Sequence, residues 1–91
     1  MATLDMHLVG ARIRTARDAL GVSQTALAAR AGLNLGNLNE IEQGRKKSVY
    51  AETIVALADA LRVSADYLLG RTDTPAPPKR PRPARSAAAV G

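Results

Sequence analysis

Several polar side chains between Leu35 and Glu42 carry the groups best suited to chemistry in this chain. Asn37 and Asn39 each hold an amide, which donates through its nitrogen and accepts through its oxygen, and this combination matches N6 and N7 of adenine. The carboxylate of Glu40 only accepts hydrogen bonds, as the N4 amino group of cytosine requires, and Leu35 can touch a thymine methyl group. These residue types permit recognition of base edges, with Asn37 as the first candidate.

Gly36 lies within the same stretch, where a glycine costs a helix about 1 kcal/mol relative to alanine. One explanation is that the backbone there must approach DNA closely, so that no side chain fits. The other is drift at an unconstrained surface position.

Residues that commonly serve catalysis and metal binding are scarce. The chain has no cysteine and a single histidine, His7. Disulfides, thiolate metal sites, a His-rich metal site and a conventional catalytic triad are therefore excluded, and no pair of carboxylates suggests a substrate pocket. We expect no catalytic residue, no metal and no cofactor, and we do not expect an enzyme.

Length and composition favour one small all-α domain. The chain has 91 residues, and its aromatic residues are Tyr50 and Tyr67 alone, so its core must consist of Leu, Ile, Val and Ala. No apolar stretch approaches the length of a signal peptide or a membrane span, so we expect a cytoplasmic protein with no membrane partner.

Apolar residues at helical spacing predict five short helices. The first carries Leu8, Val9, Ile13, Ala16 and Leu20. Ser23, Asn34 and Ser64 are predicted to cap the second, third and fifth helices, because their side-chain oxygens can accept backbone N–H groups. The helices end at glycines that can adopt a left-handed conformation, namely Gly21, Gly32, Gly44 and Gly70.

The segment Asp18-Ala-Leu-Gly-Val-Ser23 has an echo in Asp59-Ala-Leu-Arg-Val-Ser64. Both segments end a helix and turn into the next one, which explains their likeness without an internal repeat. If Arg62 adopts a positive φ where Gly21 does so freely, that corner loses about 1 kcal/mol or more.

The second and third predicted helices have the pattern of a helix-turn-helix. Ala28 provides the small side chain needed where the two helices approach most closely, Gly32 makes the turn, and Leu38 and Ile41 point inward. This arrangement predicts that a short helix protrudes and fits the major groove, which is about 12 Å wide. Its outward residues are predicted to be Leu35, Gly36, Asn37, Asn39 and Glu40.

Three groups of residues at fixed offsets lie between Ser23 and Gly70, and the resemblance that they carry covers roughly Leu8 to Gly70. They read Ser23-Gln24-x-x-Leu27-Ala28-x-x-x-Gly32, then Leu38-x-x-Ile41-Glu42-x-Gly44, then Leu57-Ala58 with Leu61-x-Val63-Ser64 and Leu68-Leu69-Gly70. With these residues the sequence resembles the phage-repressor or XRE-type helix-turn-helix family, which includes the lambda repressor and Cro. The resemblance implies a compact five-helix, lambda-repressor-like DNA-binding domain.

The resemblance also implies roles for individual residues. The base-reading positions of the family fall on Leu35, Gly36 and Glu40, with Asn37 and Asn39 close by. Phosphate contacts fall at the starts of the second and third helices and at the end of the third helix with its following loop, on Ser23, Gln24, Asn34, Gln43, Arg45, Lys46 and Lys47. An Arg and a Glu that are paired in relatives correspond to Arg17 and Glu42.

Two departures from the family pattern affect these roles. Relatives often have Gln, Ser or Arg where this chain has Leu35 and Gly36, so the usual amide contacts to bases do not carry over. Relatives also commonly have Pro in the loop where Ser48 and Val49 stand here.

The charge is unevenly distributed. Residues 1–70 hold eight Lys and Arg against seven Asp and Glu, whereas residues 71–91 hold five against one. We therefore predict a DNA-binding domain over 1–70 and a disordered, Pro- and Arg-rich basic tail over 71–91. The tail either adds non-specific attraction to phosphates or is a plain solvated appendage; its basic residues include Lys79, Arg80, Arg82 and Arg85.

These observations predict a bacterial or phage regulator of transcription, more specifically a repressor. It would bind double-stranded DNA at a pseudo-palindromic operator as a homodimer, with the helix Leu35 to Glu42 in the major groove, and it would be nucleoid-associated when bound. The alternative is an antitoxin or protein-interaction module on the same fold, with a toxin or a co-regulator as its partner.

Overall fold

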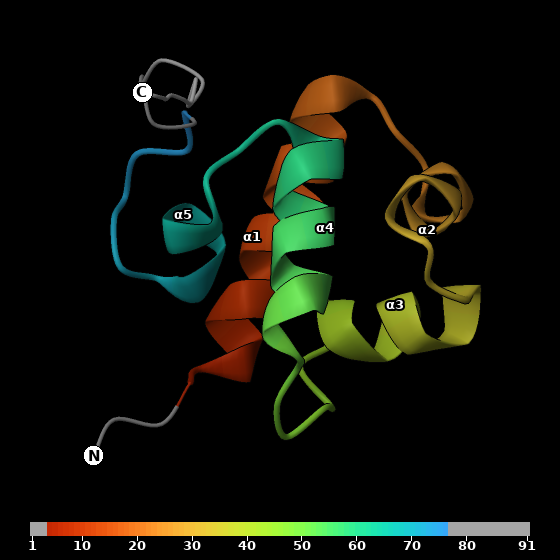
Figure 1. Cartoon of the computed structure of the whole chain (residues 1–91), viewed down its shortest axis with the longest axis horizontal. Coiled ribbons are helices and arrows are strands. Elements are labelled where there is room, and N and C mark those ends of the chain that lie inside the picture. The colour runs from red at the N-terminus through yellow and green to blue at the C-terminus, as the bar shows by residue number, and fades with distance from the viewer. Residues whose placement is uncertain (1–3, 77–91) are drawn as a thin grey trace, which may run out of the picture.

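A computed structural model describes residues 4–76 of the chain and contains five helices and no strand within that range. The predicted all-α fold is therefore confirmed. None of the helices among residues 4–76 is long and apolar enough to cross a membrane. The helices are α1 (Met6–Leu20), α2 (Gln24–Ala31), α3 (Leu35–Glu42), α4 (Ala51–Leu61) and α5 (Ala65–Leu69), shown in Figure 1.

The ends of the helices follow the predicted capping residues. Ser23, Asn34 and Ser64 each accept a backbone N–H of the helix that they precede. The first helix begins earlier than its apolar pattern indicates, because Asp5 Oδ1 accepts from the backbone N–H groups of His7 and Leu8, both at 3.1 Å. Left-handed glycines follow the last turns of four helices, namely Gly21, Gly32, Gly44 and Gly70.

Helix α4 lacks both kinds of capping residue. Tyr50 precedes it and makes no side-chain hydrogen bond to its first turn. Arg62 ends it with φ 61° and ψ 39°, close to the φ 68° and ψ 33° of Gly21 at the end of α1. Arg62 is the one non-glycine residue with positive φ among residues 4–76, so the predicted strained corner is present.

One apolar core joins all five helices. Helices α1 and α4 lie side by side, with α2 and α3 on one side of them and α5 on the other (Figure 1). Met6 of α1 and Tyr67 of α5 belong to this core with Leu68, so the expectation of a core made of Leu, Ile, Val and Ala alone is wrong. The largest fully buried apolar side chains are Val9, Ile13, Leu27, Leu38, Ile41, Leu57, Leu61 and Leu68.

Helix α1 approaches the end of α3 very closely at Gly10. A Cβ atom at this buried position would lie 2.6 Å from the carbonyl oxygen of Ile41, and backbone atoms cannot yield as a flexible side chain can. Gly10 is therefore required by helix packing. This contact fixes α3 against the rest of the domain.

Residues just after the boundary predicted at Gly70 make hydrogen bonds with the domain. Arg12 on α1 donates through Nη1 to the carbonyl oxygens of Tyr67 at 2.8 Å and Thr72 at 2.5 Å, and through Nη2 to Asp73 Oδ1 at 2.8 Å. The backbone N–H of Ser64 donates to the carbonyl oxygen of Pro75 at 3.0 Å. Thr72, Asp73 and Pro75 therefore contact the domain. The remainder of the predicted tail lies outside the described residues.

Candidate nucleic-acid interface

Helices α2 and α3 form the predicted helix-turn-helix. Ala28 is buried between helices, and its carbonyl oxygen accepts from the backbone N–H of Leu33 at 2.9 Å just after the turn at Gly32. Leu38 and Ile41 are buried and anchor α3 to the core. The opposite side of α3 is consequently free to face a ligand.

The five predicted base-reading residues divide into two groups. Leu35, Gly36 and Glu40 are exposed, and Leu35 leaves 45% of its surface in solvent. Asn37 and Asn39 are half-buried, so the two amides are less exposed than the expectation that all five residues face outward. The reason is that both amides face other parts of the protein, Asn37 toward a pocket and Asn39 toward α2.

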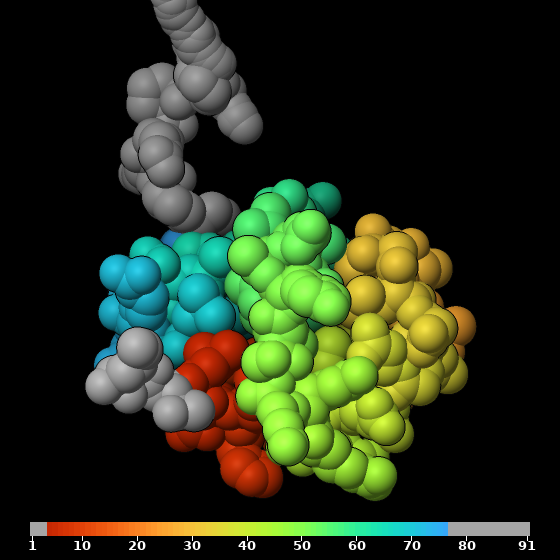
Figure 2. All heavy atoms as spheres, turned by 60° about the horizontal axis from the view of Figure 1, so that its bottom comes forward, coloured from red at the N-terminus to blue at the C-terminus, as the bar shows by residue number. Residues whose placement is uncertain are grey.

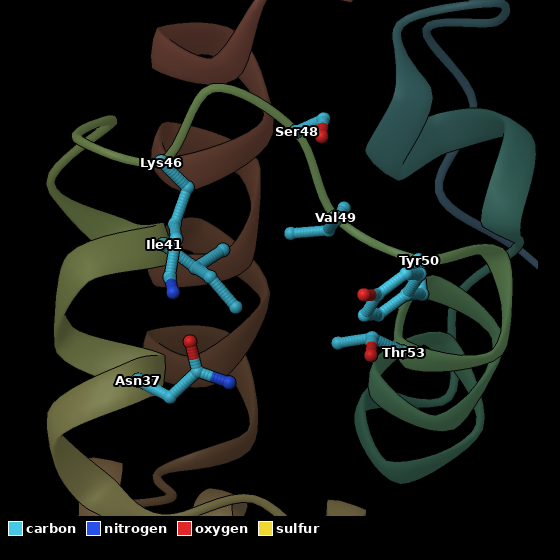
Figure 3. A pocket seen from close by; sticks show the side chains of 7 residues that line it. All are labelled: Asn37, Ile41, Lys46, Ser48, Val49, Tyr50 and Thr53. Carbon is cyan, nitrogen blue, oxygen red and sulfur yellow. The ribbon is translucent and has the colours of Figure 1, made fainter.

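Asn37 lines a pocket between α3 and the start of α4. Figure 3 shows its amide pointing away from α3 toward Tyr50 and Thr53. The pocket has a volume of about 270 Å³ and is also lined by Ile41, Lys46, Ser48 and Val49. Asn37 Oδ1 is buried and has no hydrogen-bond partner among residues 4–76. A ligand that reaches this pocket would therefore meet an unsatisfied acceptor.

A basic loop forms one rim of the same pocket. Arg45 and Lys47 are exposed, and Lys46 Nζ lies 3.4 Å from Glu40 Oε1 on α3. The loop and α4 occupy one face of the molecule beside α3 (Figure 2). Because no side chain caps α4, the N–H groups of its first turn add partial positive charge to this rim.

The start of α2 offers a second group of donors. Ser23 Oγ accepts from the backbone N–H of Ala26 at 3.1 Å, which leaves its hydroxyl proton free to donate. The side chain of Gln24, a predicted phosphate contact, turns instead toward α3. Gln24 Nε2 donates to Asn39 Oδ1 at 3.3 Å and to Glu42 Oε1 at 3.1 Å.

The side-chain oxygen of Asn34 is also occupied by a hydrogen bond within the protein. Its Oδ1 accepts from the backbone N–H of Asn37 at 2.7 Å, so that Nδ2 remains as its donor toward an anion. Gln43 is exposed, and its Nε2 donates to Asn39 Oδ1 at 3.1 Å.

Arg17 on α1 and Glu42 on α3 form a double hydrogen bond. Arg17 Nε lies 2.9 Å from Glu42 Oε2, and Nη2 lies 3.1 Å from Oε1. The hydrogen bond to Glu42 raises the pKa of Arg17, so the guanidinium remains charged. The Glu42 side chain is only 1% exposed, and Arg14 also donates to its backbone carbonyl. The pair therefore fixes the end of α3 against α1.

Sequence reasoning missed three features of this face. The contact between Asn39 and Gln43 has a local signal, because residues four apart on a helix are neighbours. The contact of Gln24 with Asn39 depends on how α2 crosses α3, and the pocket beside Tyr50 depends on the path of the loop. Neither of these has a signal in the local sequence.

The exposed side of α3, held in place by the buried side chains Leu38 and Ile41 and flanked by donor groups, defines the class of helix-turn-helix DNA-binding domains. Residues 8–69 match the family described as "Helix-turn-helix domain". The chain belongs to this family, and its resemblance to the phage repressors is confirmed by solved structures.

Two of those structures match most of the described residues. The restriction-modification controller protein C.AhdI of Aeromonas hydrophila is 34% identical with a TM-score of 0.66, and the match covers 70% of this chain and 96% of that one. The P22 c2 repressor, solved with a synthetic operator, is 34% identical with a TM-score of 0.62 over 67% of this chain and 91% of the other.

A curated relative comes from Rhodospirillum rubrum and is named an uncharacterized transcriptional regulator in the ATPase CF(0) region. It is 38% identical over 64 residues, which are 70% of this chain. The match spans 57% of the length of that relative.

Proposed function

We propose that this chain is a sequence-specific DNA-binding regulator of transcription that places α3 in the major groove. The observation that carries the proposal is the position of the exposed side of α3 between two sets of donors, at the start of α2 and in the loop after α3. Phosphate contacts on both sides of a groove fix the register of a recognition helix.

The exposed residues of α3 suit direct contact with bases. Leu35 can meet a thymine methyl group, and Glu40 can accept from cytosine N4. Gly36 has open space around it, since an added Cβ would find its nearest neighbour, Asn34 Oδ1, at 3.7 Å. The absence of a side chain there is thus not required by the folded domain and is consistent with close approach of DNA to the backbone.

The flanking donors divide into two phosphate contacts. At the first, Ser23 donates through its hydroxyl, Gln24 through its backbone N–H, and Asn34 through Nδ2. At the second, Arg45, Lys46 and Lys47 act with Gln43 and the uncapped N-terminus of α4. Asn37, which faces the second contact, would accept a hydrogen bond from a water molecule through its buried oxygen, and that water could donate its other proton to a phosphate.

We propose further that the chain acts as a homodimer and as a repressor. A domain of this size reaches specific affinity by occupying two half-sites about 34 Å apart, and a two-fold protein then requires a pseudo-palindromic operator. Repression requires only that the bound dimer occupy the operator. The operator complex of the P22 c2 repressor supports this assignment. A cytoplasmic location follows from access to DNA.

The test is selection of DNA by the full-length chain from a library of random duplexes, followed by sequencing. The proposal predicts enrichment of a pseudo-palindrome whose half-site centres are about 10 base pairs apart. Enrichment of a single half-site would refute binding as a dimer but would still support a sequence-specific DNA-binding regulator. Recovery of unselected sequences would refute the regulator itself.

A second candidate is an antitoxin or another protein-interaction module on this fold. The exposed apolar side chains Leu35, Tyr50 and Val55 favour it, because such side chains are available to a protein partner. This candidate predicts a partner that co-purifies with the chain and is lost in Leu35→Ala. Replacing Arg45, Lys46 and Lys47 with alanine should leave that partner bound, whereas the same change should abolish binding to DNA.

A further inference from the structure

Five polar side chains, four on helices α1, α2 and α3 and one on the residue that follows α3, form one continuous hydrogen-bonded network beside the exposed side of α3. Arg17 on α1 pairs with Glu42, which accepts from Gln24 on α2. Gln24 Nε2 also donates to Asn39 Oδ1 at 3.3 Å, and Gln43 Nε2 donates to the same oxygen at 3.1 Å. This hydrogen-bonded network thus connects a buried ion pair to an amide on the recognition helix.

The ionised carboxylate of Glu42 fixes the direction of every hydrogen bond in this network. The Glu42 carboxylate is paired with Arg17 and can only accept, so Gln24 must turn its nitrogen toward it. That same nitrogen faces Asn39, which must therefore present its oxygen. Gln43 then has to donate as well, because the atom that it meets is the Asn39 oxygen.

Asn39 is left with a donor as its free group. Its Oδ1 already accepts two hydrogen bonds, which is the capacity of an amide oxygen. Asn37 Oδ1 is the one buried, unpartnered side-chain polar atom among residues 4–76. Asn39 Nδ2 has no partner in that range either and is not fully buried, so it remains as a donor.

An asparagine with this polarity cannot make the usual bidentate contact with adenine. That contact needs an acceptor for N6 and a donor for N7, and the acceptor of Asn39 is occupied. Guanine presents two neighbouring acceptors, N7 and O6, to a single donor in the major groove. A donor-only side chain therefore favours guanine over adenine at the base pair that it meets.

We propose that Asn39 is a specificity-determining residue that selects guanine in each half-site, and that Gln24 is the positioning residue that sets its polarity. This inference rests on the proposed function, since it requires α3 to lie in the major groove. It assigns Gln24 a role beyond contact with phosphate, because its side chain then controls which base the neighbouring helix accepts.

The test repeats the selection from random duplexes with four full-length proteins: the unmodified chain, Gln24→Met, Asn39→Asp and Asn37→Asp. The unmodified chain should favour guanine over adenine about tenfold at one position of each half-site. Gln24→Met keeps the volume of the side chain but frees Asn39 to rotate, so adenine should rise to a level similar to guanine at that position alone.

Asn39→Asp should reverse the preference. One carboxylate oxygen takes the place of Oδ1 and still accepts from Gln24 and Gln43, and the other presents an acceptor to DNA. Guanine should then fall about tenfold at that position relative to the bases whose major-groove edge offers a donor, cytosine and adenine. Asn37→Asp adds the same charge two residues away and should leave the guanine preference intact, which separates polarity from general repulsion of DNA.

Three outcomes would overturn the inference. A selected adenine at the position that responds to Asn39→Asp would show that the amide is not held as a donor. A consensus in which no position responds to Asn39→Asp would remove Asn39 from base recognition while leaving the proposed function in place. Recovery of no consensus by the unmodified chain would refute the proposed function and this inference together.

Discussion

Arg17 of α1 and Glu42 of α3 meet through two hydrogen bonds, of 2.9 Å and 3.1 Å, with the carboxylate almost completely buried. An ion pair at this depth adds little stability compared with an apolar pair, but removal of one partner leaves a buried charge without compensation. The pair also gives the hydrogen-bonded network through Gln24 its direction. It therefore links the packing of α1 against α3 to the chemistry offered on the recognition helix.

Arg17→Met should lower the free energy of unfolding by about 3–5 kcal/mol, because it leaves the Glu42 carboxylate unpaired. The double variant Arg17→Met with Glu42→Leu should recover most of that loss, since both charges are gone. Urea unfolding measures both values. A double variant as unstable as the single one would show that the pair contributes more than the burial of its charges explains.

The contribution of the Arg17–Glu42 pair to the free energy of unfolding should persist at mildly alkaline pH. The pKa of Arg17 is higher in the folded than in the unfolded chain, so its contribution is complete below the unfolded pKa. It is lost only when the pH rises through the raised folded value. The difference in stability between the unmodified chain and Arg17→Met should therefore remain constant across neutral and mildly alkaline pH.

Gly36→Ala should separate stability from DNA binding. Alanine fits the free domain and favours the helix, so the free energy of unfolding should rise by about 1 kcal/mol. If the backbone approaches DNA closely, affinity for the selected operator should nevertheless fall about tenfold, a loss similar to that from one mismatched base pair. Unchanged affinity would support the alternative that Gly36 is a product of drift.

Arg62→Gly should stabilise the domain, because glycine adopts the left-handed conformation at the end of α4 without strain. We expect a gain of about 0.5–1 kcal/mol, the strain relieved less the extra entropy of glycine in the unfolded chain. The matched control is Gly21→Arg at the equivalent corner of α1, where no atom obstructs a side chain and only φ is unfavourable. It should lower stability by a similar amount; a gain in both variants would contradict the explanation.

Arg12 should hold residues 71–76 against the domain. Its guanidinium bonds two backbone carbonyls and lies 4.4 Å from the centre of the Tyr67 ring, so Arg12→Ala should cost about 1–3 kcal/mol in urea unfolding. Asp73, which is 98% exposed, offers the control, and Asp73→Ala should leave stability within experimental error. Equal losses in the two variants would assign the effect to the surface ion pair.

The fold of this chain could be predicted largely from its local sequence. Caps such as Ser23 and Asn34 and left-handed glycines such as Gly32 act within a few residues of themselves, so their type and position identify helix ends. The close approach at Gly10 and the contacts of Arg12 with residues sixty positions away depend on packing across the domain. Such contacts leave no periodic pattern in the sequence.

The candidate interface was predictable to a lesser degree. The α3 residues at its exposed side, Leu35 and Glu40, follow from helical periodicity once Leu38 and Ile41 are assigned to the core. The direction in which an amide points depends instead on what it meets. Asn37 turns toward the loop and Asn39 toward Gln24, because the loop and α2 pass beside them.

The measurement that tests the central claim most directly is fluorescence anisotropy of the full-length chain on the selected operator and on a scrambled duplex, across a series of salt concentrations. We predict that the operator binds at least about a thousandfold more tightly than the scrambled duplex. Lys46→Ala should weaken both duplexes alike and reduce the slope of log affinity against log salt by about one. Equal affinity of the unmodified chain for the two duplexes would contradict sequence-specific recognition by α3.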